Sequence, residues 1–292
     1  MVVKSDVVFR WVRLLRSKFE NYSIEEELRG WSWFKPPLRS RAHLGLSVYD
    51  VASYCPTRRD VWLRRVVGVR AQPSPQMRCG LDVHSVISDV ISIVRKGVFS
   101  SQDPELISSR VGRYIRSLSN HNPNARFLRE VGWLTYHTLM TEYMWYERGI
   151  SAQPALLWLN EVRVDGTLIG LSNHLRIDSL PIANIVVDFK VGRRHENHDL
   201  MVTAYALALE SNLEVPVDYG ILVYLNWDGK LSVDTNGIYV GPDLRREFID
   251  SRDEAIDLIL TGREPPKAAG ECAPSCPYLG ICRGERIEES RD

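Results

Sequence analysis

Apolar residues recur at helical spacing through the first half of the chain. Between residues 81 and 96 they fall at every third or fourth position, and Gly97 follows the last of them. This period predicts an amphipathic helix. Ser47 and Asp50 have the spacing of a helix-capping pair and predict a short helix that leads to Cys55. Further helices are predicted over residues 7–19, 57–67, 105–118 and 127–148.

The pattern changes after residue 150 to short apolar runs separated by turn residues. Asp165-Gly166 and Asp228-Gly229 are strong hairpin signals. We expect the first to join strands 156–164 and 167–171, and the second to join 219–227 and 230–234. Further strands are predicted over 174–180, 184–189 and 237–240, and helices over 198–211 and 243–261.

The order of these elements predicts an α/β fold, in which a mixed central sheet is flanked by helices behind an N-terminal helical lobe. We expect a mainly helical lobe over 1–150, a core domain over 151–262, and a cysteine-rich segment with a tail over 263–292. The three parts are expected to form one interlocked unit.

Composition narrows the class of protein. The 292 residues have an apolar fraction of 44% and a formal net charge of zero, so a nucleic-acid surface would have to be a local basic patch. No apolar run reaches the roughly 18 residues of a membrane span. The first residues carry Arg10 and Trp11 within their apolar stretch and do not resemble a signal peptide. We expect a cytoplasmic protein without a membrane partner.

Two acids and a lysine stand where neighbouring strands are predicted to end. Asp178 lies at the end of one strand, and Asp188 and Lys190 end the next. Two carboxylates held together are stable when a cation lies between them, and carboxylate oxygens suit Mg²⁺ or Mn²⁺. Lys190 would then hold a water molecule or a phosphate oxygen beside the metal. Taken alone, these residues fit an ordinary surface ion pair better.

Cysteines form a second group. Cys272, Cys276 and Cys282 lie close together near the C-terminal end, and Cys55 lies far upstream. Such spacing in an intracellular chain favours metal binding over disulfides. Zinc and an iron–sulfur cluster both fit four thiolates. Cys79 is compatible with a buried apolar role.

Basic and aromatic residues are candidates for DNA contacts. Arg58 and Arg59 follow Cys55, and Arg193 and Arg194 follow the strand of Asp188. Arginines neutralise phosphates, and exposed aromatic rings stack on unpaired bases. A solvated surface explains the first arginine pair equally well, whereas Arg193 and Arg194 adjoin the proposed site.

The order of these motifs resembles the RecB-like branch of the PD-(D/E)XK nuclease superfamily. Gly80-Leu81-Asp82-Val83-His84 matches the upstream histidine helix of that branch, and Asp178 and the Asp188-Phe189-Lys190 run follow in the same order. The resemblance implies that His84, Asp178, Asp188 and the carbonyl of Phe189 bind the metal. It implies that Lys190 orients the attacking water, and that Tyr205 touches DNA or the site.

Three positions depart from that branch. Asp188 replaces the usual glutamate, Met201 replaces a glutamine, and Leu175 replaces a glycine. Methionine provides neither the donors nor the acceptor of an amide. A second hypothesis is therefore a catalytically weak DNA-binding or scaffolding subunit.

One cysteine before the nuclease motifs and three after them resemble the iron-staple nucleases. This resemblance implies a [4Fe-4S] cluster on Cys55, Cys272, Cys276 and Cys282, with [2Fe-2S] second and zinc third. The combination resembles the CRISPR-associated Cas-four exonuclease family, in its longer archaeal variant associated with subtype I-A systems. It implies DNA processing during spacer acquisition with the CRISPR integrase and its small partner protein. A zinc-stabilised repair nuclease is a third hypothesis, and the oligomeric state stays open.

Overall fold

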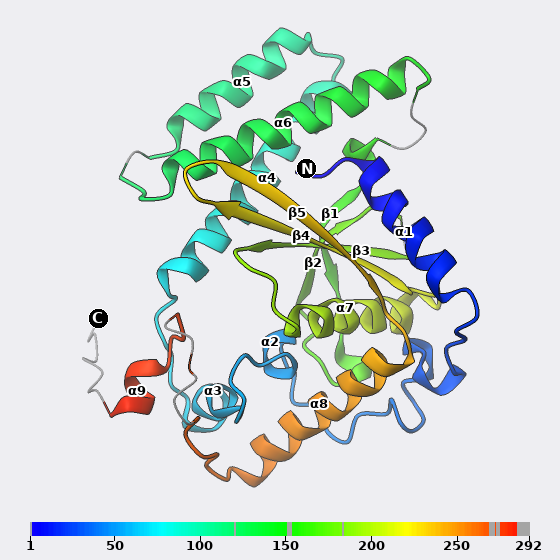
Figure 1. Cartoon of the computed structure of the whole chain (residues 1–292), viewed down its shortest axis with the longest axis vertical. Coiled ribbons are helices and arrows are strands. Elements are labelled where there is room, and N and C mark those ends of the chain that lie inside the picture. The colour runs from blue at the N-terminus through cyan, green and yellow to red at the C-terminus, as the bar shows by residue number, and fades with distance from the viewer. Residues whose placement is uncertain are drawn as a thin grey trace.

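A mixed five-stranded sheet forms the centre of the protein, and its strands follow chain order from β1 to β5 (Figure 1). The computed structural model describes residues 2–119, 121–150, 154–182, 184–268, 272 and 275–284. Strands β3 and β4 are parallel, and the other neighbouring pairs are antiparallel. The strands are β1 Leu159–Val164, β2 Leu175–Leu180, β3 Ile185–Val191, β4 Tyr219–Trp227 and β5 Leu231–Tyr239.

Helix α7, Asn197–Leu213, joins the two parallel strands. Parallel neighbouring strands need such a crossover, because a tight turn reverses the chain direction and can join only antiparallel strands. With β1 and β2 on one side and β5 on the other, the sheet confirms the predicted α/β class.

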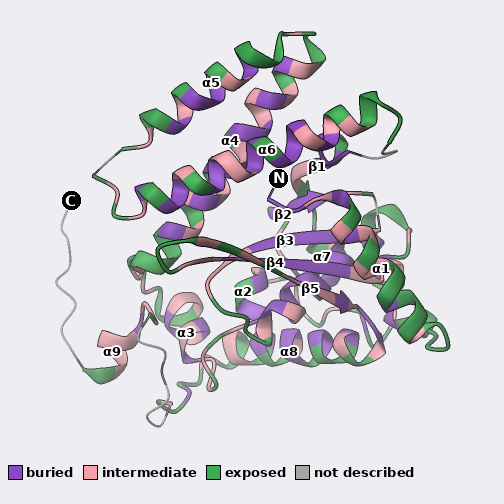
Figure 2. Ribbon diagram, turned by 45° about the horizontal axis from the view of Figure 1, so that its top comes forward, coloured by how far each residue is buried: buried purple, intermediate pink, exposed green. Residues whose placement is uncertain are grey.

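Helices cover both faces of the sheet and enclose two apolar cores. On one face, α7 packs with α2, Val48–Val51, and α8, Pro242–Thr261. Side chains alternate along β3, so Val186 belongs to this core and Val187 to the opposite one. Figure 2 shows the central strands and α7 as largely buried.

The opposite face carries the helical lobe, which lies above the sheet in Figure 1. Its core combines apolar residues from all four lobe helices with those of β3 and β4. The helices are α1 Ser5–Phe19, α4 Pro75–Phe99, α5 Pro104–Ser117 and α6 Ala125–Glu147. The helices predicted over residues 7–19, 81–96, 105–118 and 127–148 are therefore confirmed. Helix α4 begins earlier than expected because Ser74 caps it and Pro75 opens it.

Short helical elements complete the chain. Ser47 and Asp50 form the predicted capping box of α2. The predicted helix over 57–67 divides into α3, Arg59–Trp62, and a π-helical turn over Leu63–Val67. The remaining short elements are 3₁₀ turns at Glu26–Leu28, Gly30–Ser32, Ala155–Leu157 and Thr167–Ile169, and helix α9 at Leu279–Arg283.

The predicted hairpin at Asp165-Gly166 is wrong. Asp165 accepts hydrogen bonds at Oδ1 from the Thr167 backbone nitrogen at 2.8 Å and from its hydroxyl at 2.7 Å. These local bonds favour a 3₁₀ turn over Thr167–Ile169, so β1 pairs with β2 instead, with Val162 opposite Ile177. The hairpin at Asp228-Gly229 is confirmed, and β5 continues through both strands predicted after it.

A buried ion pair ties the N-terminal segment to the sheet side that carries α7. Arg245 of α8 donates to Glu210 of α7 at 2.7 Å, and both side chains are fully buried. Glu210 also accepts from the backbone nitrogens of Gly30 and Val217 at 2.7 and 2.9 Å. These bonds satisfy the buried carboxylate and fix the segment that leads towards α2.

No helix in the described ranges is both long enough and apolar enough to cross a membrane. The predicted tail from residue 285 onward lies outside the described residues.

Candidate active site

Helix α4 places His84 against the edge of the sheet. Val83 and Ile87 are buried on the lobe side of α4, while His84 Nδ1 lies 3.1 Å from Asp178 Oδ1 of β2. Burial lowers the pKa of His84, but the charge and hydrogen bond of Asp178 outweigh burial, so the pKa is raised overall. The predicted proximity of these two residues is present in the structure.

Glu161 of β1 joins the pair and was missed by sequence reasoning. The β1–β2 register pairs Asn160 with Ser179 and Val162 with Ile177, which puts Glu161 between them and opposite Asp178. Its backbone has a positive φ of 54°, rare for a residue with a side chain. Ligand atoms of His84, Glu161 and Asp178 all lie within 4.8 Å of one another. The available signal was an acid inside the strand that precedes Asp178.

The electrostatics of Glu161 reflect this crowding. Burial raises its pKa, the charge of Asp178 raises it further, and Arg176 opposes both. Arg176 forms an ion pair with Glu161 through its Nε atom, and Arg176 itself is largely exposed. Glu161 is held beside a second carboxylate, that of Asp178, although this raises its pKa. Such an arrangement fits a cation-binding site better than an ordinary surface ion pair.

Strand β3 brings Asp188 and Lys190 to the same region. Lys190 Nζ lies 2.6 Å from Asp188 Oδ2, and both side chains are mostly buried. The pKa of Asp188 is raised to about 6. Burial is the largest cause, the charge of Asp178 acts in the same direction, and Lys190 opposes both. Burial lowers the pKa of Lys190, but Asp188 outweighs this effect and the pKa is raised. Lys190 is therefore positively charged across the physiological range.

The pKa of Asp178 shifts in the opposite direction to the pKa of Asp188. Burial raises its pKa, but His84 and Lys190 lower it below the usual value. Its Oδ2 atom also accepts the backbone N–H of Phe189 at 2.6 Å, which links β2 to β3. Two neighbouring carboxylates thus differ in proton affinity, a common property of functional sites.

The residues present fit a hard divalent cation. The buried Oδ2 atom of Asp188 lies 2.6 Å from the Lys190 ammonium, so Lys190 already satisfies it. The fit to a cation comes from the donor set itself, because carboxylate oxygens and an imidazole nitrogen of His84, Glu161 and Asp178 converge within 4.8 Å. Asp188 is not part of that compact group.

Tyr205 lies beside the site rather than on an open surface. It is buried on α7, and burial raises its pKa, with Asp188 and Asp178 raising it further and Lys190 opposing. Met201, one turn earlier, is also buried. The methionine therefore fills the core where the resembling branch has an amide.

The four predicted DNA-contacting arginines divide into two pairs. Arg193 and Arg194 are exposed beyond the end of β3, and Arg194 lies 3.2 Å from Asp199. Arg58 instead donates to the backbone carbonyl of Val51 at 3.1 Å. Arg59 is buried and donates to the Pro265 carbonyl at 2.6 Å. The first pair is exposed where phosphates could reach it, although Arg194 also bonds Asp199 and Asn236, whereas the second pair holds this chain's own segments together.

The cysteines gather around α3, and Figure 1 shows α9 beside that helix. Burial raises the pKa of Cys276, and Cys272 and Cys55 raise it further. Arg59 interacts electrostatically with Cys282. All four are free thiols of intermediate exposure, whereas Cys79 is buried in the lobe core. The arrangement fits a group held by several thiolates, with Arg59 compensating part of their charge.

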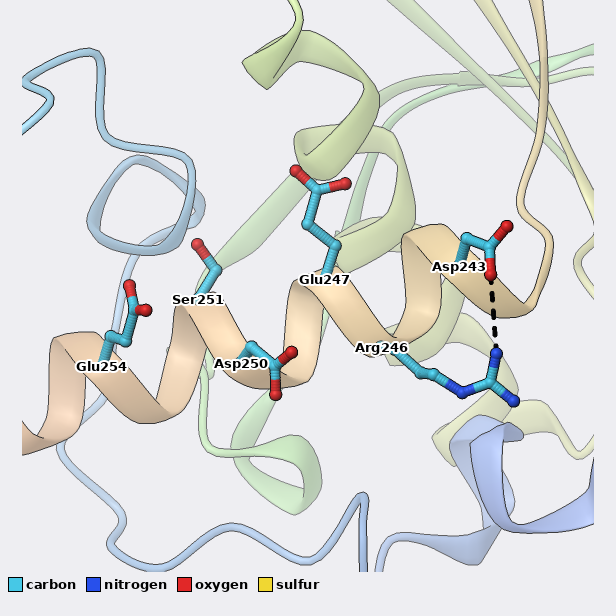
Figure 3. Close-up of a pocket in the computed structure, with 6 residues that line it drawn as sticks. All are labelled: Asp243, Arg246, Glu247, Asp250, Ser251 and Glu254. Carbon is cyan, nitrogen blue, oxygen red and sulfur yellow. Dashed lines mark ion pairs between the residues drawn. The ribbon is translucent and has the colours of Figure 1, made fainter.

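An open hollow of about 470 Å³ lies elsewhere. Figure 3 shows that one helix, α8, supplies its lining residues, among them four carboxylates. Arg246 lies 3.5 Å from Asp243 there. Phosphates are repelled by such a surface, so this hollow is separate from the candidate active site.

Comparisons with known proteins agree on one family. The model of the family described as CRISPR-associated exonuclease Csa1 matches residues 1–286. The chain is 31% identical over 261 residues to the CRISPR-associated exonuclease Csa1 of Thermoproteus tenax, which covers 89% of this chain and 92% of the relative. It is 28% identical over 273 residues to the protein of that name from Saccharolobus solfataricus, with the same shares of 89% and 92%.

A shorter match extends the relationship. The chain is 35% identical over 80 residues to the CRISPR-associated exonuclease Cas4 of Aeropyrum pernix. This match covers 27% of the chain and 38% of that protein. It agrees with the Cas-four-like resemblance of the motifs, while the matches over most of the chain are to the Csa1 proteins.

Proposed function

Because the chain belongs to the Csa1 family of CRISPR-associated exonucleases, we propose that it is a Mg²⁺- or Mn²⁺-dependent deoxyribonuclease that trims DNA ends. The observation that carries this proposal is the convergence of His84, Glu161 and Asp178 within 4.8 Å of one another. The ion pair of Asp188 and Lys190 lies beside them on β3. The site has the core elements and order of the PD-(D/E)XK motifs that the sequence resembles.

In this proposal His84, Glu161, Asp178, Asp188 and the carbonyl of Phe189 hold the metal. A bound divalent ion supplies Lewis acidity to the phosphate and lowers the pKa of a water molecule. Asp178 is prepared for this role because His84 and the Phe189 nitrogen already fix both of its oxygens. The protein thereby holds the ligand set in place before DNA arrives.

Lys190 orients the attacking water and offsets the charge that develops on the phosphate. Its ammonium is held 2.6 Å from Asp188, and its pKa is raised, so it enters the reaction charged. Arg193 and Arg194 lie exposed past the end of the same strand and hold the DNA backbone. Tyr205 is buried on α7 within the electrostatic reach of Asp188 and Lys190 and limits the access of water to them.

The cysteines are proposed to carry an iron–sulfur cluster, [4Fe-4S] first, [2Fe-2S] second and zinc third. The interactions among Cys55, Cys272 and Cys276 support a shared group. Such a group cross-links the segment before the nuclease motifs to the segment after them. Visible absorption and iron analysis of the purified protein decide between a cluster and zinc, since zinc gives no colour.

The cellular role proposed is processing of DNA during CRISPR spacer acquisition, in the cytoplasm. The names of the relatives support a CRISPR-linked exonuclease. The CRISPR integrase and its small partner protein are the proposed partners, and the longer subtype I-A variant is the proposed system.

A second candidate function is a DNA-binding subunit with weak or absent catalysis. Two observations favour it: Asp188 has the shorter carboxylate, and Met201 is buried where an amide was expected. In that case the protein keeps the fold, the cysteine site and the surface that binds DNA, but it does not hydrolyse DNA.

One experiment separates the two functions. Purified protein is incubated with single-stranded DNA and Mn²⁺, and compared with Asp188→Ala and with Asp234→Ala, a matched aspartate on β5. Nuclease function predicts cleavage by the wild type and Asp234→Ala, and loss of at least about a hundredfold with Asp188→Ala. Equal cleavage by all three contradicts the assigned site, and binding without cleavage by any of them supports the second function.

A further inference from the structure

Three exposed aromatic side chains surround the charged residues of β3. Tyr49 of α2 is 53% exposed, and Tyr54, on the turn after α2, is 46% exposed. His195, on the loop between β3 and α7, is also exposed. We refer to Tyr49, Tyr54 and His195 as the aromatic rim.

The rim lies next to the candidate active site. The charge of Lys190 acts on Tyr54, and Tyr49 acts on Lys190. Burial raises the pKa of Tyr54 although almost half of the side chain is exposed. The Tyr54 ring also contacts His198 at the start of α7, with ring centroids 5.9 Å apart, which places Tyr54 beside the loop that follows β3.

The rings of Tyr54 and His195 meet edge to face. Their centroids are 4.7 Å apart and their planes are inclined by 69°. Both rings also contact the buried His198, with centroids 5.9 Å from Tyr54 and 6.1 Å from His195, and the exposed part of each ring is left for another flat group. The Asn197 backbone nitrogen donates to His195 Nδ1 at 3.2 Å, which fixes the orientation of the imidazole.

The turn that carries Tyr54 is fixed from both sides. Asn197 of α7 donates to the Ser53 carbonyl, and the Ser53 hydroxyl donates to Asp60 at 2.6 Å. The next residue is Cys55, whose backbone nitrogen donates to the Ser53 hydroxyl at 3.1 Å. The turn that carries Tyr54 is therefore fixed to α7 on one side and to α3 on the other.

A partly exposed aromatic pair beside the proposed phosphate contacts has the features of a base-stacking platform. Every nucleobase has an aromatic face that can stack on such a ring. Bases inside a duplex already stack on their neighbours and cannot reach it without unpairing. Arg193 and Arg194, exposed two and one residues before His195, provide positive charge for the backbone of the same nucleotide.

We propose that the aromatic rim stacks the unpaired terminal bases of DNA and so makes this site select frayed or single-stranded ends over blunt duplex ends. This inference rests on the proposed nuclease function for the position of the scissile phosphate. Tyr54 and His195 are the specificity-determining residues, and Tyr49 borders them.

The test measures binding without cleavage. Oligonucleotides with 2-aminopurine as the terminal base, at either end, are titrated with protein in EDTA, where fluorescence quenching reports stacking. The variants are Tyr54→Ala and Tyr54→Phe, with Tyr146→Ala as a matched control because Tyr146, at the far end of α6, is 43% exposed. Thermal melting verifies that each variant is folded.

The rim predicts quenching by the wild type, Tyr54→Phe and Tyr146→Ala, and loss of quenching with Tyr54→Ala. It also predicts that Tyr54→Ala binds single-stranded ends about tenfold more weakly, with blunt duplex binding unchanged. Unchanged quenching with Tyr54→Ala, or an equal loss on both kinds of end, would overturn the inference. A failure of catalysis leaves this binding result untouched, so the two proposals fail independently.

Discussion

The two chemically distinctive regions of the protein are built in different ways. The candidate active site is formed by strands and a long helix, and its charged side chains are already paired with one another, His84 with Asp178 and Lys190 with Asp188. The cysteine region consists of short helices and connecting segments, and its four thiols are only partly buried. The first region takes its geometry from the core, and the second would gain comparable rigidity from the proposed cross-link.

Side chains of α3 order the segment that leads to the C-terminal cysteines. Arg59 connects α3 to Pro265 and Glu264, and Trp62 Nε1 donates to the Gly262 carbonyl at 2.9 Å. The candidate active site takes its shape from the sheet, whereas this segment is held by side chains of a short helix.

The largest effect is expected at the cysteine region. Cys276→Ser should remove a ligand of the proposed group that links Cys55 to the C-terminal cysteines and reduce the free energy of unfolding by up to about 5 kcal/mol. Chemical denaturation measures this loss. The matched control is Cys79→Ala, in the lobe core, for which we expect a loss of about 1 kcal/mol. Similar losses for the two variants would show that no group is shared by the four cysteines.

A smaller and more local effect is expected from Glu161→Gln. It keeps the size of the side chain but removes a carboxylate from the metal group, so Mn²⁺ binding should weaken by about tenfold or more while stability changes little. Calorimetric titration measures the affinity. Arg176→Gln breaks the same ion pair from the other side and should leave Mn²⁺ binding intact. Equal effects of the two variants would reduce Glu161 to an ion-pair partner.

The last prediction concerns the pH dependence of stability, to which the buried His198 beside β3 contributes. Burial lowers the pKa of His198 to about 3, and the charge of Lys190 adds to this shift. An unfolded histidine has a pKa of about 6.5. As the pH falls below that value the unfolded chain gains a proton that the folded protein does not bind, so stability declines towards pH 3.

His198→Gln should remove this part of the acid sensitivity. We expect its melting temperature to fall less than that of the wild type between about pH 7 and about pH 4. Thermal melts over this range provide the measurement, with His121→Gln at an exposed position as the control. A wild-type slope in His198→Gln would show that other groups account for the acid sensitivity.

Local patterns were sufficient for most elements of the fold. The apolar periodicity of α4 and the alternation along β3 predicted both elements, because each has an uninterrupted buried face. The hairpin at Asp165-Gly166 failed because the Asp165 side chain bonds locally to Thr167, and the sequence signal for a turn does not say which strand follows. Capping at Ser47 was predicted because it depends on residues only three apart.

The candidate site was predicted only in part. His84, Asp178, Asp188 and Lys190 stand out by motif order, and the structure brings them to one region. Glu161 could not be found in this way, because its role depends on the β1–β2 register and on a positive φ. The arginines at 58 and 59 looked like DNA contacts in sequence, but their hydrogen-bond partners lie mostly around two hundred residues further along the chain.

The sequence by itself determined the elements, the order of the acidic and cysteine motifs, and the residue types available for a divalent metal. Those properties depend on local periodicity and on side-chain chemistry, which neighbouring residues fix. Only the tertiary structure decided that Glu161 joins His84 and Asp178, that Arg59 is a buried anchor, and that Tyr54 and His195 meet beside β3. Contacts between residues far apart in the chain follow from strand register and helix packing, and no short segment of sequence encodes them.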